Sequence, residues 1–558
     1  MRRFGSYLTA LAAAGLIGFF LGFIVGFREW APAWLTLSLL KSVRTGAVAW
    51  LIGIALSPAL GFVLSRRHPS SATSSRRAGR VIARAALITL GLAPAILWLP
   101  GLGHIGEMRK AAAIGRRPGD HRPNLVLITI DAQRADYLGA YGSSRGLTPN
   151  LDAFARDATR YDCAYASSPW TLTSLAALFT SLPPSGAGLK TPHQKTGAWY
   201  RPAAKLPEDR ALLSELLQRA GYATAADLTN VFLESDRGWT RGFDYYRNEG
   251  GADGTNSDNA IARTLTRNGL AWLTLNWRQP YFLWLHYLDP HCPYSSPDTP
   301  EALRARYPEH WVARRDRWYY GIRNAPAKEQ ALFKQFCRDM YAEEVRYADK
   351  WVGELLRGLK ARGMYDDSLI VITADHGEEL FERGGMDHGH SLHEEVLHVP
   401  LLVKWPKGVA ADRVVTHTVP MRFIAGTLLQ LAKAPALNGA NQALPMRNSQ
   451  AASEVYSEGL LYGTERTALT TDKYKIVYHP YEGSGNDQFE VYDRSSDRRE
   501  RHNLASTNAA SDLRHHLRAL TEGADRTAAQ VTSDPTVGAL NISDDAKRRM
   551  RSLGYLGK

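Results

Sequence analysis

The chain has 558 residues, of which 44% are hydrophobic, and a formal net charge of +13, enough material for one large domain with additional segments. Much of the positive excess lies in residues 66–80 and in the last residues of the chain, and neither segment carries a nucleic-acid motif, so no nucleic-acid partner is predicted. Three cysteines (Cys163, Cys292 and Cys337) are too few for a disulfide framework, although one disulfide is possible.

Three apolar runs near the N-terminus predict a transmembrane anchor within residues 1–102. They lie at about 6–27, 45–64 and 83–100; the first is long enough to cross ~30 Å of hydrocarbon, and the third is short for a span. By the positive-inside rule, the Arg-rich loop between the second and third runs stays cytoplasmic. We therefore expect a multi-pass protein of the cell (inner) membrane, in contact with membrane lipids, with its main domain on the periplasmic or extracellular side. The alternative for the first run, a cleaved signal peptide, leaves that domain on the same side.

A polar linker is expected at 103–122, and beyond it predicted strands alternate with helices. Buried strands are predicted at Asn124–Ile130, Tyr281–His286 and Ser368–Thr373, and helices at Pro149–Ala158 and Asp209–Ala220. This order is typical of an α/β domain with a mostly parallel sheet flanked by helices, expected to cover 123–450. In the remainder, 451–558, the runs EVYSEG, TALTTDKYKIVY and QFEVYD predict a small C-terminal antiparallel sheet, and a basic terminal helix is expected from Ser543.

Three of the predicted strands end in side chains that can bind a metal or move a proton. Asp131 follows the first, the second runs into HYLDPHCPY, and the third into Asp375-His376-Gly377. In open α/β sheets the ligand site lies at the carboxyl ends of the strands, so these residues are expected to meet. The segment GGMDHGHSLHEEVLHVP follows with four histidines, for which a solvated His-rich loop is the alternative: His388, His390, His393 and His398.

The stretch SSPWTLTSLAALFTS, residues 167–181, is a turn that leads into a short apolar helix, with Thr171 at the junction. A hydroxyl at a helix N-terminus faces unpaired backbone N–H groups and the positive end of the helix dipole, where an oxyanion can be held. On this stretch alone the alternative is simple N-capping, which Ser and Thr commonly provide. Together with the strand-end residues, the stretch predicts a metal site that activates a hydroxyl nucleophile.

Several ordered motifs resemble the sulfatases of the alkaline phosphatase superfamily. NLVLITIDAQRADYLGAYG and TPNLDAFARDATRYDCAYA resemble the opening strand and first helix of that family, and YAEEVRYADKWVGELL its long central helix. TADHGEELFERGGMDHGHSLHEEVLHVPLLV resembles its second metal segment, and TDKYKIVY with VYDRSSDRRERHNLA its small C-terminal sheet. The resemblance covers roughly residues 123–505 and implies a fold like that of the sulfatases and alkaline phosphatase.

At the nucleophile position this chain departs from the sulfatase pattern. Sulfatases carry C/S-x-P-x-R ahead of a helix, and the Cys or Ser is converted to formylglycine. Aligning AALFTS with that helix puts Thr171 at the nucleophile position and Leu175 on the arginine, so no formylglycine is expected. An alternative register through Ser167 and Pro169 still places Thr171 on the arginine and moves the helix out of phase. A threonine nucleophile resembles the phosphoethanolamine transferases and lipoteichoic acid synthases.

The resemblance implies a metal site formed by Asp131, Thr171, Asp375 and His376. Sulfatases have a second Asp where this chain has Ala132, and Asp-Asn where it has Asp-His. Four ligands of mixed oxygen and nitrogen type are too few and too nitrogenous for a good calcium cage. One divalent ion is expected, with zinc or manganese favoured and calcium or magnesium as alternatives.

The remaining roles follow from the resemblance and from the chemistry of ester cleavage. His291 and His388 are the predicted catalytic partners of Thr171, supplying a proton to the leaving group. His388 stands where sulfatases carry a sulfate-binding Lys, and Asn230 lies near the place of their missing Gly-Lys-Trp-His segment. His286 and Asp289 are candidates to orient these groups. The predicted substrate-binding residues are Asn230, His286, His291, His388 and His390.

We expect a membrane-anchored, metal-dependent hydrolase that acts on sulfate or phosphate esters through a metal-bound Thr171 and a covalent intermediate. The substrate is expected to be a sulfated or phosphorylated glycan, lipid or polymer. One alternative is a phosphoethanolamine or phosphoglycerol transferase that modifies an envelope glycolipid or polymer, and another is an envelope binding protein without catalysis. The segment from about Ser295 to Lys334, rich in Arg, Trp and Tyr, is predicted to be an insertion, either at the substrate entrance or as a surface excursion.

Overall fold

The computed structural model describes residues 121–189, 205–248, 261–276, 280–309, 311, 325–438, 442–450, 454–480 and 488–532. The chain divides into two units, Met1–Lys110 and Ala111–Lys558, and every described residue belongs to the second. The predicted anchor, the linker as far as residue 120 and the helix expected from Ser543 lie outside the described residues. Within the described ranges, no helix combines the length and apolar character needed to cross a membrane.

A nine-stranded sheet forms the centre of the described unit, in the order β11-β2-β10-β6-β1-β5-β3-β4, with β9 paired to β2. Its strands are β1 (Asn124–Ile130), β2 (Thr159–Tyr165), β3 (Ala223–Leu228), β4 (Tyr245–Asn248), β5 (Tyr281–Tyr287), β6 (Ser368–Ala374), β9 (His398–Val399), β10 (Leu401–Lys404) and β11 (Val414–Pro420). β1 runs parallel to β5 and β6, β3 parallel to β4 and β5, and β11 parallel to β2. Only β10 and β9 pair antiparallel within the described sheet, which is therefore mostly parallel, as predicted.

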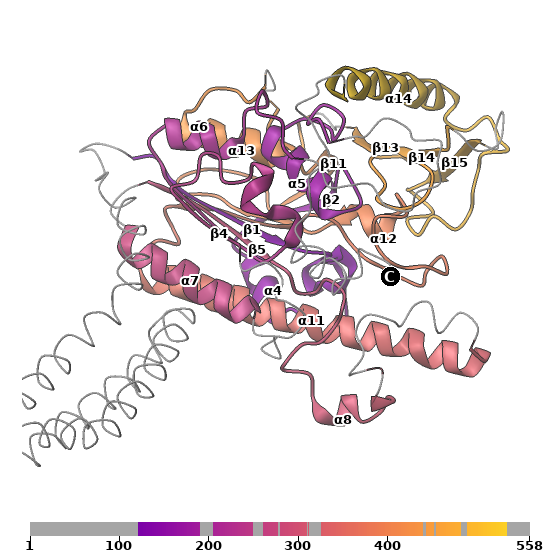
Figure 1. The fold of residues 1–558 in the computed structure, drawn as a ribbon, viewed down its shortest axis with the longest axis horizontal. Helices are drawn as coiled ribbons and strands as arrows, with labels where there is room; N and C mark the ends of the chain where they lie inside the picture. The colour runs from indigo at the N-terminus through magenta and orange to yellow at the C-terminus, as the bar shows by residue number, and fades with distance from the viewer. Residues whose placement is uncertain are drawn as a thin grey trace, which may run out of the picture. The chain divides into compact units, whose positions relative to one another are not determined.

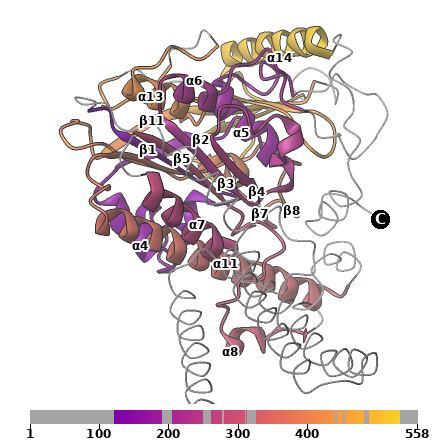
Figure 2. The same ribbon diagram turned by 60° about the vertical axis from the view of Figure 1, so that its left-hand side comes forward.

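Helices cover both faces of this sheet (Figures 1 and 2). One face carries α4 (Pro149–Ala155), α7 (Ile261–Asn276) and α11 (Ala327–Ala361), and α11 packs against the other two. The opposite face carries α5 (Thr171–Thr180), α6 (Leu213–Arg219) and α13 (Phe423–Ala432), which also contact one another. Because both faces are covered, every residue of β1, β5 and β6 is buried, and such strands consist of continuous apolar runs.

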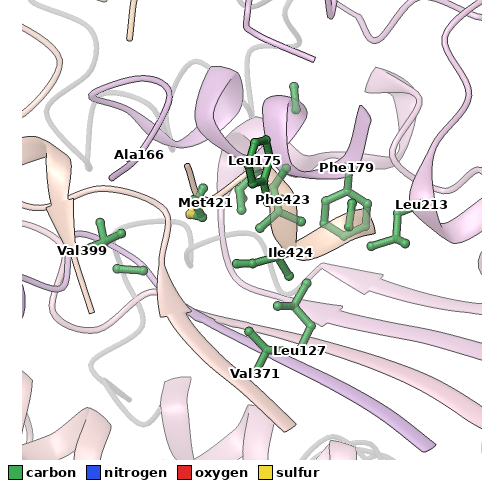
Figure 3. Close-up of a cluster of buried hydrophobic side chains, with 14 of the residues drawn as sticks. Leu127, Ala166, Leu175, Phe179, Leu213, Val371, Val399, Met421, Phe423 and Ile424 are labelled. Carbon is green, nitrogen blue, oxygen red and sulfur yellow. The ribbon is translucent and has the colours of Figure 1, made fainter. Parts of the chain in front are cut away.

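The apolar core fixes α5, the helix that begins at Thr171. All ten residues of α5 are buried, including its four hydroxyl-bearing residues, and the helix packs against α13 and α6. Figure 3 shows Leu175 and Phe179 of α5 near Ile424 of α13, above Leu127 of β1. The Phe179 ring also lies 4.3 Å, centroid to centroid, from that of Trp284 on β5. This packing holds the N-terminus of α5 in a fixed position relative to the strand ends.

Three predicted helices differ in length from the observed ones. The helix expected at Pro149–Ala158 ends at Ala155, because the chain turns there to enter β2. The helix expected at Asp209–Ala220 begins only at Leu213, where the Glu215 carboxylate accepts a hydrogen bond from the Leu212 amide. The central helix is longer than expected: α11 has 35 residues. Its first turns belong to the segment Ser295–Lys334, and α8 (Glu301–Arg304) lies in the same segment; the description of this segment as an insertion stays a prediction.

The predicted C-terminal antiparallel sheet is present as β12 (Val455–Ser457), β13 (Thr467–Thr470), β14 (Tyr474–Tyr478) and β15 (Phe489–Asp493). A helix that the sequence did not predict, α14 (Ser511–Thr532), packs on β13 and β14 (Figure 1). Its Leu517 joins Leu469, Ile476 and Val491 in a separate small core. The remaining short elements are β7 (Glu379–Leu380), β8 (Met386–Asp387), α12 (Glu394–Leu397), and 3-10 turns at 135–137, 139–141, 231–233 and 235–237. All three cysteines are free, so the possible disulfide is not formed.

Candidate active site

Four predicted site residues converge at the carboxyl ends of β1 and β6. Asp131 follows β1, while Asp375 and His376 follow β6, the parallel neighbour of β1. Thr171, the first residue of α5, reaches the same point from the covering helix layer. All four side chains are completely buried. The fold therefore brings together the residues predicted as metal ligands, here called the ligand group, although their role stays a prediction.

The polar atoms of this group face one another at short range. His376 Nε2 lies 3.4 Å from Asp131 Oδ1 and 3.4 Å from Asp375 Oδ2. Thr171 Oγ1 lies 3.3 Å from His376 Nε2 and 3.4 Å from Asp131 Oδ2. One ligand atom from each of Asp131, Asp375 and His376 lies within 4.8 Å of the others, which is the spacing of a metal-binding group.

The protonation of His376 shows that this group fits a cation. Its Nδ1 lies 2.8 Å from the carbonyl oxygen of Gly377, which only accepts, so Nδ1 carries the proton. Burial, followed by the charge of His388, lowers the pKa of His376 well below its usual range, so the ring is neutral and Nε2 presents a lone pair. That lone pair faces Asp131 Oδ1 and Asp375 Oδ2, two buried oxygens without a hydrogen-bond donor. A cation among these atoms removes the mutual repulsion of three lone pairs.

The two carboxyl groups have opposite pKa shifts. Burial, reinforced by the charge of Asp131, raises the pKa of Asp375 well above its usual range. Burial also raises the pKa of Asp131, but the charge of His291 and the hydrogen bond from His286 outweigh it and bring that pKa below its usual range. Two carboxylates crowded into one dry space cannot both stay ionised without positive charge nearby. The shifts therefore agree with the orphaned oxygens in pointing to a cation site.

Thr171 does not act as an N-cap. The capping position of α5 belongs to Trp170, and Thr171 is already helical, with its hydroxyl turned toward Asp131 and His376. The Trp170 indole donates a hydrogen bond to the Gly459 carbonyl at 2.6 Å, which fixes the turn before α5. The capping alternative for Thr171 is therefore wrong.

The alternative nucleophile, Ser167, makes no hydrogen bond to Asp131, Asp375 or His376. Its Oγ is buried and has no hydrogen-bond partner among the described residues, while its carbonyl accepts a hydrogen bond from the Glu458 amide at 3.1 Å. In contrast, the first turn of α5 is tied to the ligand segment, because Ser174 Oγ donates to the Asp375 carbonyl at 2.6 Å. The geometry favours Thr171 over Ser167.

Asn230 and His286 support Asp131. Asn230 Nδ2 donates to Asp131 Oδ2 at 2.7 Å and lies 3.4 Å from Thr171 Oγ1, and its Oδ1 accepts from the Phe232 amide, which fixes the orientation of the side chain. His286 Nε2 lies 3.2 Å from the same Asp131 oxygen, and its Nδ1 lies 2.8 Å from Thr129 Oγ1. Because both ring nitrogens of His286 have protein partners, its geometry favours orienting Asp131 over binding substrate.

His388 and His291 form the other side of the site. The ring of His388 lies 4.2 Å from that of His376 and 4.8 Å from that of His291, centroid to centroid. His388 Nδ1 donates to Glu378 Oε2 at 2.8 Å, and the Tyr294 hydroxyl donates to Glu378 Oε1 at 2.5 Å. Glu378 and Tyr294 were not predicted as site residues. Glu378 lies in the motif DHGE and Tyr294 in the motif PHCPY, but the hydrogen bond between them depends on how two distant loops meet.

His388 is charged in this environment. Burial lowers its pKa, but the neighbouring carboxylates of Asp387 and Glu378 outweigh burial and raise the pKa of His388 well above its usual range. The other three histidines of the His-rich segment place Nε2 against protein acceptors: Glu379 for His390, Glu490 for His393 and the carbonyl of Asp162 for His398. The other ring nitrogen of His390, a predicted substrate-binding residue, is Nδ1, which lies 3.3 Å from the carbonyl oxygen of His388. Among these four, only His388 adjoins the ligand group in the described structure.

Comparison with known proteins gives one consistent result. Residues 123–434 match the family model of the sulfatases, and residues 382–526 match that of the N-sulphoglucosamine sulphohydrolase C-terminal region. The chain is 22% identical over 460 residues to the uncharacterized sulfatase YidJ of Escherichia coli K12, covering 71% of this chain and 86% of that protein. It is also 22% identical over 477 residues to a delta 4,5-hexuronate-2-O-sulfatase of Bacteroides thetaiotaomicron, covering 78% and 94%.

Solved structures give the same fold. A crystal structure of a putative sulfatase from Bacteroides thetaiotaomicron superposes with a TM-score of 0.56 at 19% identity, covering 77% of this chain and 96% of that one. The sulfatase-like fold expected from the sequence motifs is thereby confirmed for the α/β unit and the small antiparallel sheet.

Proposed function

The chain belongs to the sulfatase family, and from this membership we propose that it hydrolyses sulfate or phosphate esters with Thr171 as the nucleophile. The family match and the named relatives indicate sulfuric ester hydrolase activity, which counts against a binding protein without catalysis. The observation that carries the Thr171 assignment is the position of its Oγ1, within 3.4 Å of both Asp131 and His376 at the start of a buried helix.

In this proposal Asp131, Thr171, Asp375 and His376 hold one divalent metal ion. The imidazole ligand favours zinc or manganese over calcium or magnesium. When bound, such an ion lowers the pKa of a hydroxyl at its site and offsets negative charge that builds up during the reaction. No formylglycine is required, because the nucleophile is the side chain of an ordinary threonine.

The residues support a two-step reaction through a covalent ester. In the first step Thr171 releases its hydroxyl proton to solvent, its Oγ forms a bond to sulfur or phosphorus, the bond to the leaving alkoxide breaks, and that alkoxide takes a proton from His291 or His388. Asn230 and the positive end of the α5 dipole face the same point and stabilise negative charge there. In the second step water attacks the Thr171 ester, one of its protons restores the Thr171 hydroxyl, the other returns to the histidine, and sulfate or phosphate is released.

The chemistry of a threonine ester supports a second candidate reaction at this site. Formylglycine can expel sulfate by re-forming an aldehyde, but esterified threonine has no such route and must be cleaved by water or by an acceptor alcohol. Transfer of phosphoethanolamine or phosphoglycerol to an envelope glycolipid or polymer therefore remains the alternative. The name of the hexuronate sulfatase relative favours a sulfated glycan as the substrate class.

We also place the protein in the cell (inner) membrane, with the catalytic unit on the periplasmic or extracellular side. This proposal rests on the apolar runs at about 6–27, 45–64 and 83–100 and on the basic loop between the last two. Membranes that carry the full chain should release it only in detergent, and release by alkaline carbonate would contradict the anchor.

The decisive experiment is the intact mass of the full chain after incubation with an aryl sulfate, an aryl phosphate or phosphatidylethanolamine. A sulfate adduct supports the hydrolase of sulfate esters, and a phosphate adduct the hydrolase of phosphate esters. A phosphoethanolamine adduct supports the transferase. Rapid turnover of every ester without any adduct after acid quenching would contradict the covalent Thr171 mechanism.

A further inference from the structure

The loop that carries His291 is fixed at both ends on one buried glutamate. The loop follows β5 from Asp289 to Ser296, and Glu344 projects from α11 with 3% of its surface exposed. The Ser295 amide donates to Glu344 Oε1, and the Ser296 amide also bonds to this carboxyl group. At the other end of the loop, the carboxyl groups of Asp289 and Glu344 lie within hydrogen-bonding reach of each other. His291 lies between these two attachments.

The bond between Asp289 and Glu344 requires a proton that neither carboxylate has when ionised. Asp289 Oδ2 and Glu344 Oε2 are buried and receive no hydrogen bond from an N–H or hydroxyl group of the described residues. A carboxylate oxygen only accepts, so two carboxyl groups can bond only if one of them is protonated. The Asp289 carboxyl also accepts from the Ala262 amide at the start of α7, which favours Asp289 as the acceptor and Glu344 as the donor.

We propose that Asp289 and Glu344 share one proton, and that this bond makes Glu344 a positioning residue for His291. Glu344 makes no contact with the ligand group of Thr171; it acts by holding the loop against α11. The inference rests on the proposed function in one respect, namely that His291 delivers a proton to the leaving group. A movement of this loop by a fraction of an ångström is enough to spoil that transfer.

The surroundings favour retention of the proton. Burial, followed by the charge of Asp289, raises the pKa of Glu344 well above its usual range, and burial raises the pKa of Asp289 to about 6. The groups that face the pair from the neighbouring elements are Tyr287 on β5, Cys292 in the loop and Tyr347 on α11, with Arg263 and Asp298 next to Tyr347. The pair thus lies among neutral phenol and thiol groups, and neither carboxyl has a salt bridge to a described cation.

Two substitutions of Glu344 separate a positioning role from simple packing. Glu344→Gln keeps a donor for Asp289 and an acceptor for the Ser295 amide, so it should retain turnover within about threefold of wild type. Glu344→Ala removes all three attachments, to Asp289 and to the Ser295 and Ser296 amides, and its loss of turnover should be at least about tenfold for an alkyl ester but much smaller for a nitrophenyl ester, which needs no proton on leaving. Equal losses on both esters, or none, would overturn the positioning role. Glu343→Gln on the same helix is the matched control and should change neither.

The shared proton has tests that need no turnover. Difference infrared spectra of the full chain should show the carbonyl band of a protonated carboxyl group that disappears in Glu344→Gln and persists in Glu343→Gln. Because folding raises both pKa values, the stabilising effect of the pair is complete below the unfolded pKa of about 4 and is lost as pH rises through the folded values. The urea midpoint of wild type should therefore fall relative to Glu344→Gln as pH rises from about 5 to about 8.

These measurements also keep the two proposals apart. If wild type cleaves no ester but the infrared band and the urea shift are present, the shared proton is supported and the proposed function has failed. If no carboxyl band depends on Glu344, the shared proton is overturned whatever the turnover of the variants.

Discussion

Two largely buried clusters of charged residues in this molecule differ in whether the protein balances their charge. One is the ligand group of Asp131, Thr171, Asp375 and His376. The other, here named the junction cluster, lies where the small sheet meets the segments around β7 and α12, and consists of Arg383, His393, Lys475, His479, Glu490 and Glu500. Both hold acidic and basic side chains at short range, so counting charged residues does not distinguish them.

The junction cluster is closed by its own members. Glu490 accepts from the Nε2 atoms of His393 and His479, each at 2.8 Å. Glu500 is fully buried, with Lys475 Nζ at 2.8 Å and Arg383 Nη2 at 3.1 Å. Each carboxylate faces a cation or a ring N–H at short range. Although Lys475 Nζ and Glu500 Oε1 pair by charge without forming a hydrogen bond within the described residues, the cluster is balanced in charge and binds the small sheet to the α/β unit.

The ligand group instead keeps a surplus of negative charge. Asp131 Oδ1 and Asp375 Oδ2 have no donor, and the histidine between them is neutral. A group of this kind is costly to bury unless something else completes it. Unmatched charge, and not the amount of charge, therefore distinguishes the ligand group from the junction cluster.

Replacing Thr171, the proposed nucleophile, should have the largest effect. Thr171→Ala should fold normally and lose both turnover and covalent adduct, by at least about a thousandfold in kcat, because within the described residues no second hydroxyl bonds to both Asp131 and His376. Steady-state kinetics and intact mass measure the two losses. Loss of stability alone, about 1 kcal/mol with chemistry intact, is what an N-cap would give and would contradict the nucleophile assignment.

The conservative variants of Thr171 serve as controls for this prediction. Thr171→Ser keeps the oxygen and loses only a methyl group, so partial activity and a covalent adduct should remain. Thr171→Cys should not be converted to formylglycine even in cells that carry the converting enzyme, because Leu175 stands where the required arginine would be.

Removing one ligand should empty the metal site while the junction cluster stays intact. Asp375→Ala should lower bound metal from about one ion per chain to near zero, measured by elemental analysis of the purified full chain. Glu490→Gln is the matched control from the junction cluster and should keep the metal. Equal metal content in wild type and Asp375→Ala would show that these residues do not hold the ion.

Breaking the junction cluster should reduce stability and leave metal content unchanged. Lys475→Met leaves the buried Glu500 carboxylate with Arg383 as its remaining ion-pair partner among the described residues, beside the hydrogen bond from the Glu394 amide. Removal of one partner from a buried ion pair costs about 3–5 kcal/mol. Urea unfolding measures the loss. Lys473→Met, at an exposed position on the same hairpin, should change the free energy of unfolding by less than about 0.5 kcal/mol.

The same cluster should make stability fall in acid. Burial raises the pKa of Glu490, but the hydrogen bonds from His393 and His479 outweigh it and bring the pKa well below its usual range. A carboxylate with a lowered folded pKa stabilises the fold above its unfolded pKa of about 4.3, and this contribution is lost as pH falls below it. Glu490→Gln should therefore unfold more easily than wild type at pH 7, by about 1–3 kcal/mol, and the two should converge in acid. A difference that does not change with pH would contradict this account.

The sequence revealed much of the fold because the central strands are covered on both faces. β1, β5 and β6 are continuous apolar runs, and the observed ends at Ile130, Tyr287 and Ala374 lie within one residue of the predicted ones. β2 was missed because Arg160 and Asp162 interrupt its apolar pattern and pair with each other on its partly exposed side. α14 was missed because its polar sequence acquires a buried face only by packing on the small sheet.

The candidate site could be predicted from the sequence only as far as strand topology determines it. Parallel strands bring Asp131 and Asp375 to one edge of the sheet, so their proximity follows from topology alone. The partners of the histidines do not follow from topology, because they depend on how loops meet in space. Glu378 is three residues from Asp375 in the sequence but acts on His388, and Glu344 reaches the His291 loop from a different layer. No periodicity in the sequence encodes these pairings.

The smallest expected effect concerns Ser167, the rival hydroxyl in the same stretch as Thr171. Its Oγ is buried without a partner, so Ser167→Ala removes an unsatisfied polar atom and leaves the contact between its carbonyl and the Glu458 amide in place. The free energy of unfolding should change by less than about 0.5 kcal/mol or increase slightly, and kcat, metal content and adduct should match wild type. If Ser167→Ala abolishes the adduct while Thr171→Ala spares it, the alignment of this stretch is shifted by four residues and Ser167 is the nucleophile. The two hydroxyls differ in the same way as the two clusters. Thr171 and Ser167 are both buried, but only the Thr171 hydroxyl contacts charged groups whose charge the protein leaves unbalanced, so burial alone does not make a hydroxyl a nucleophile.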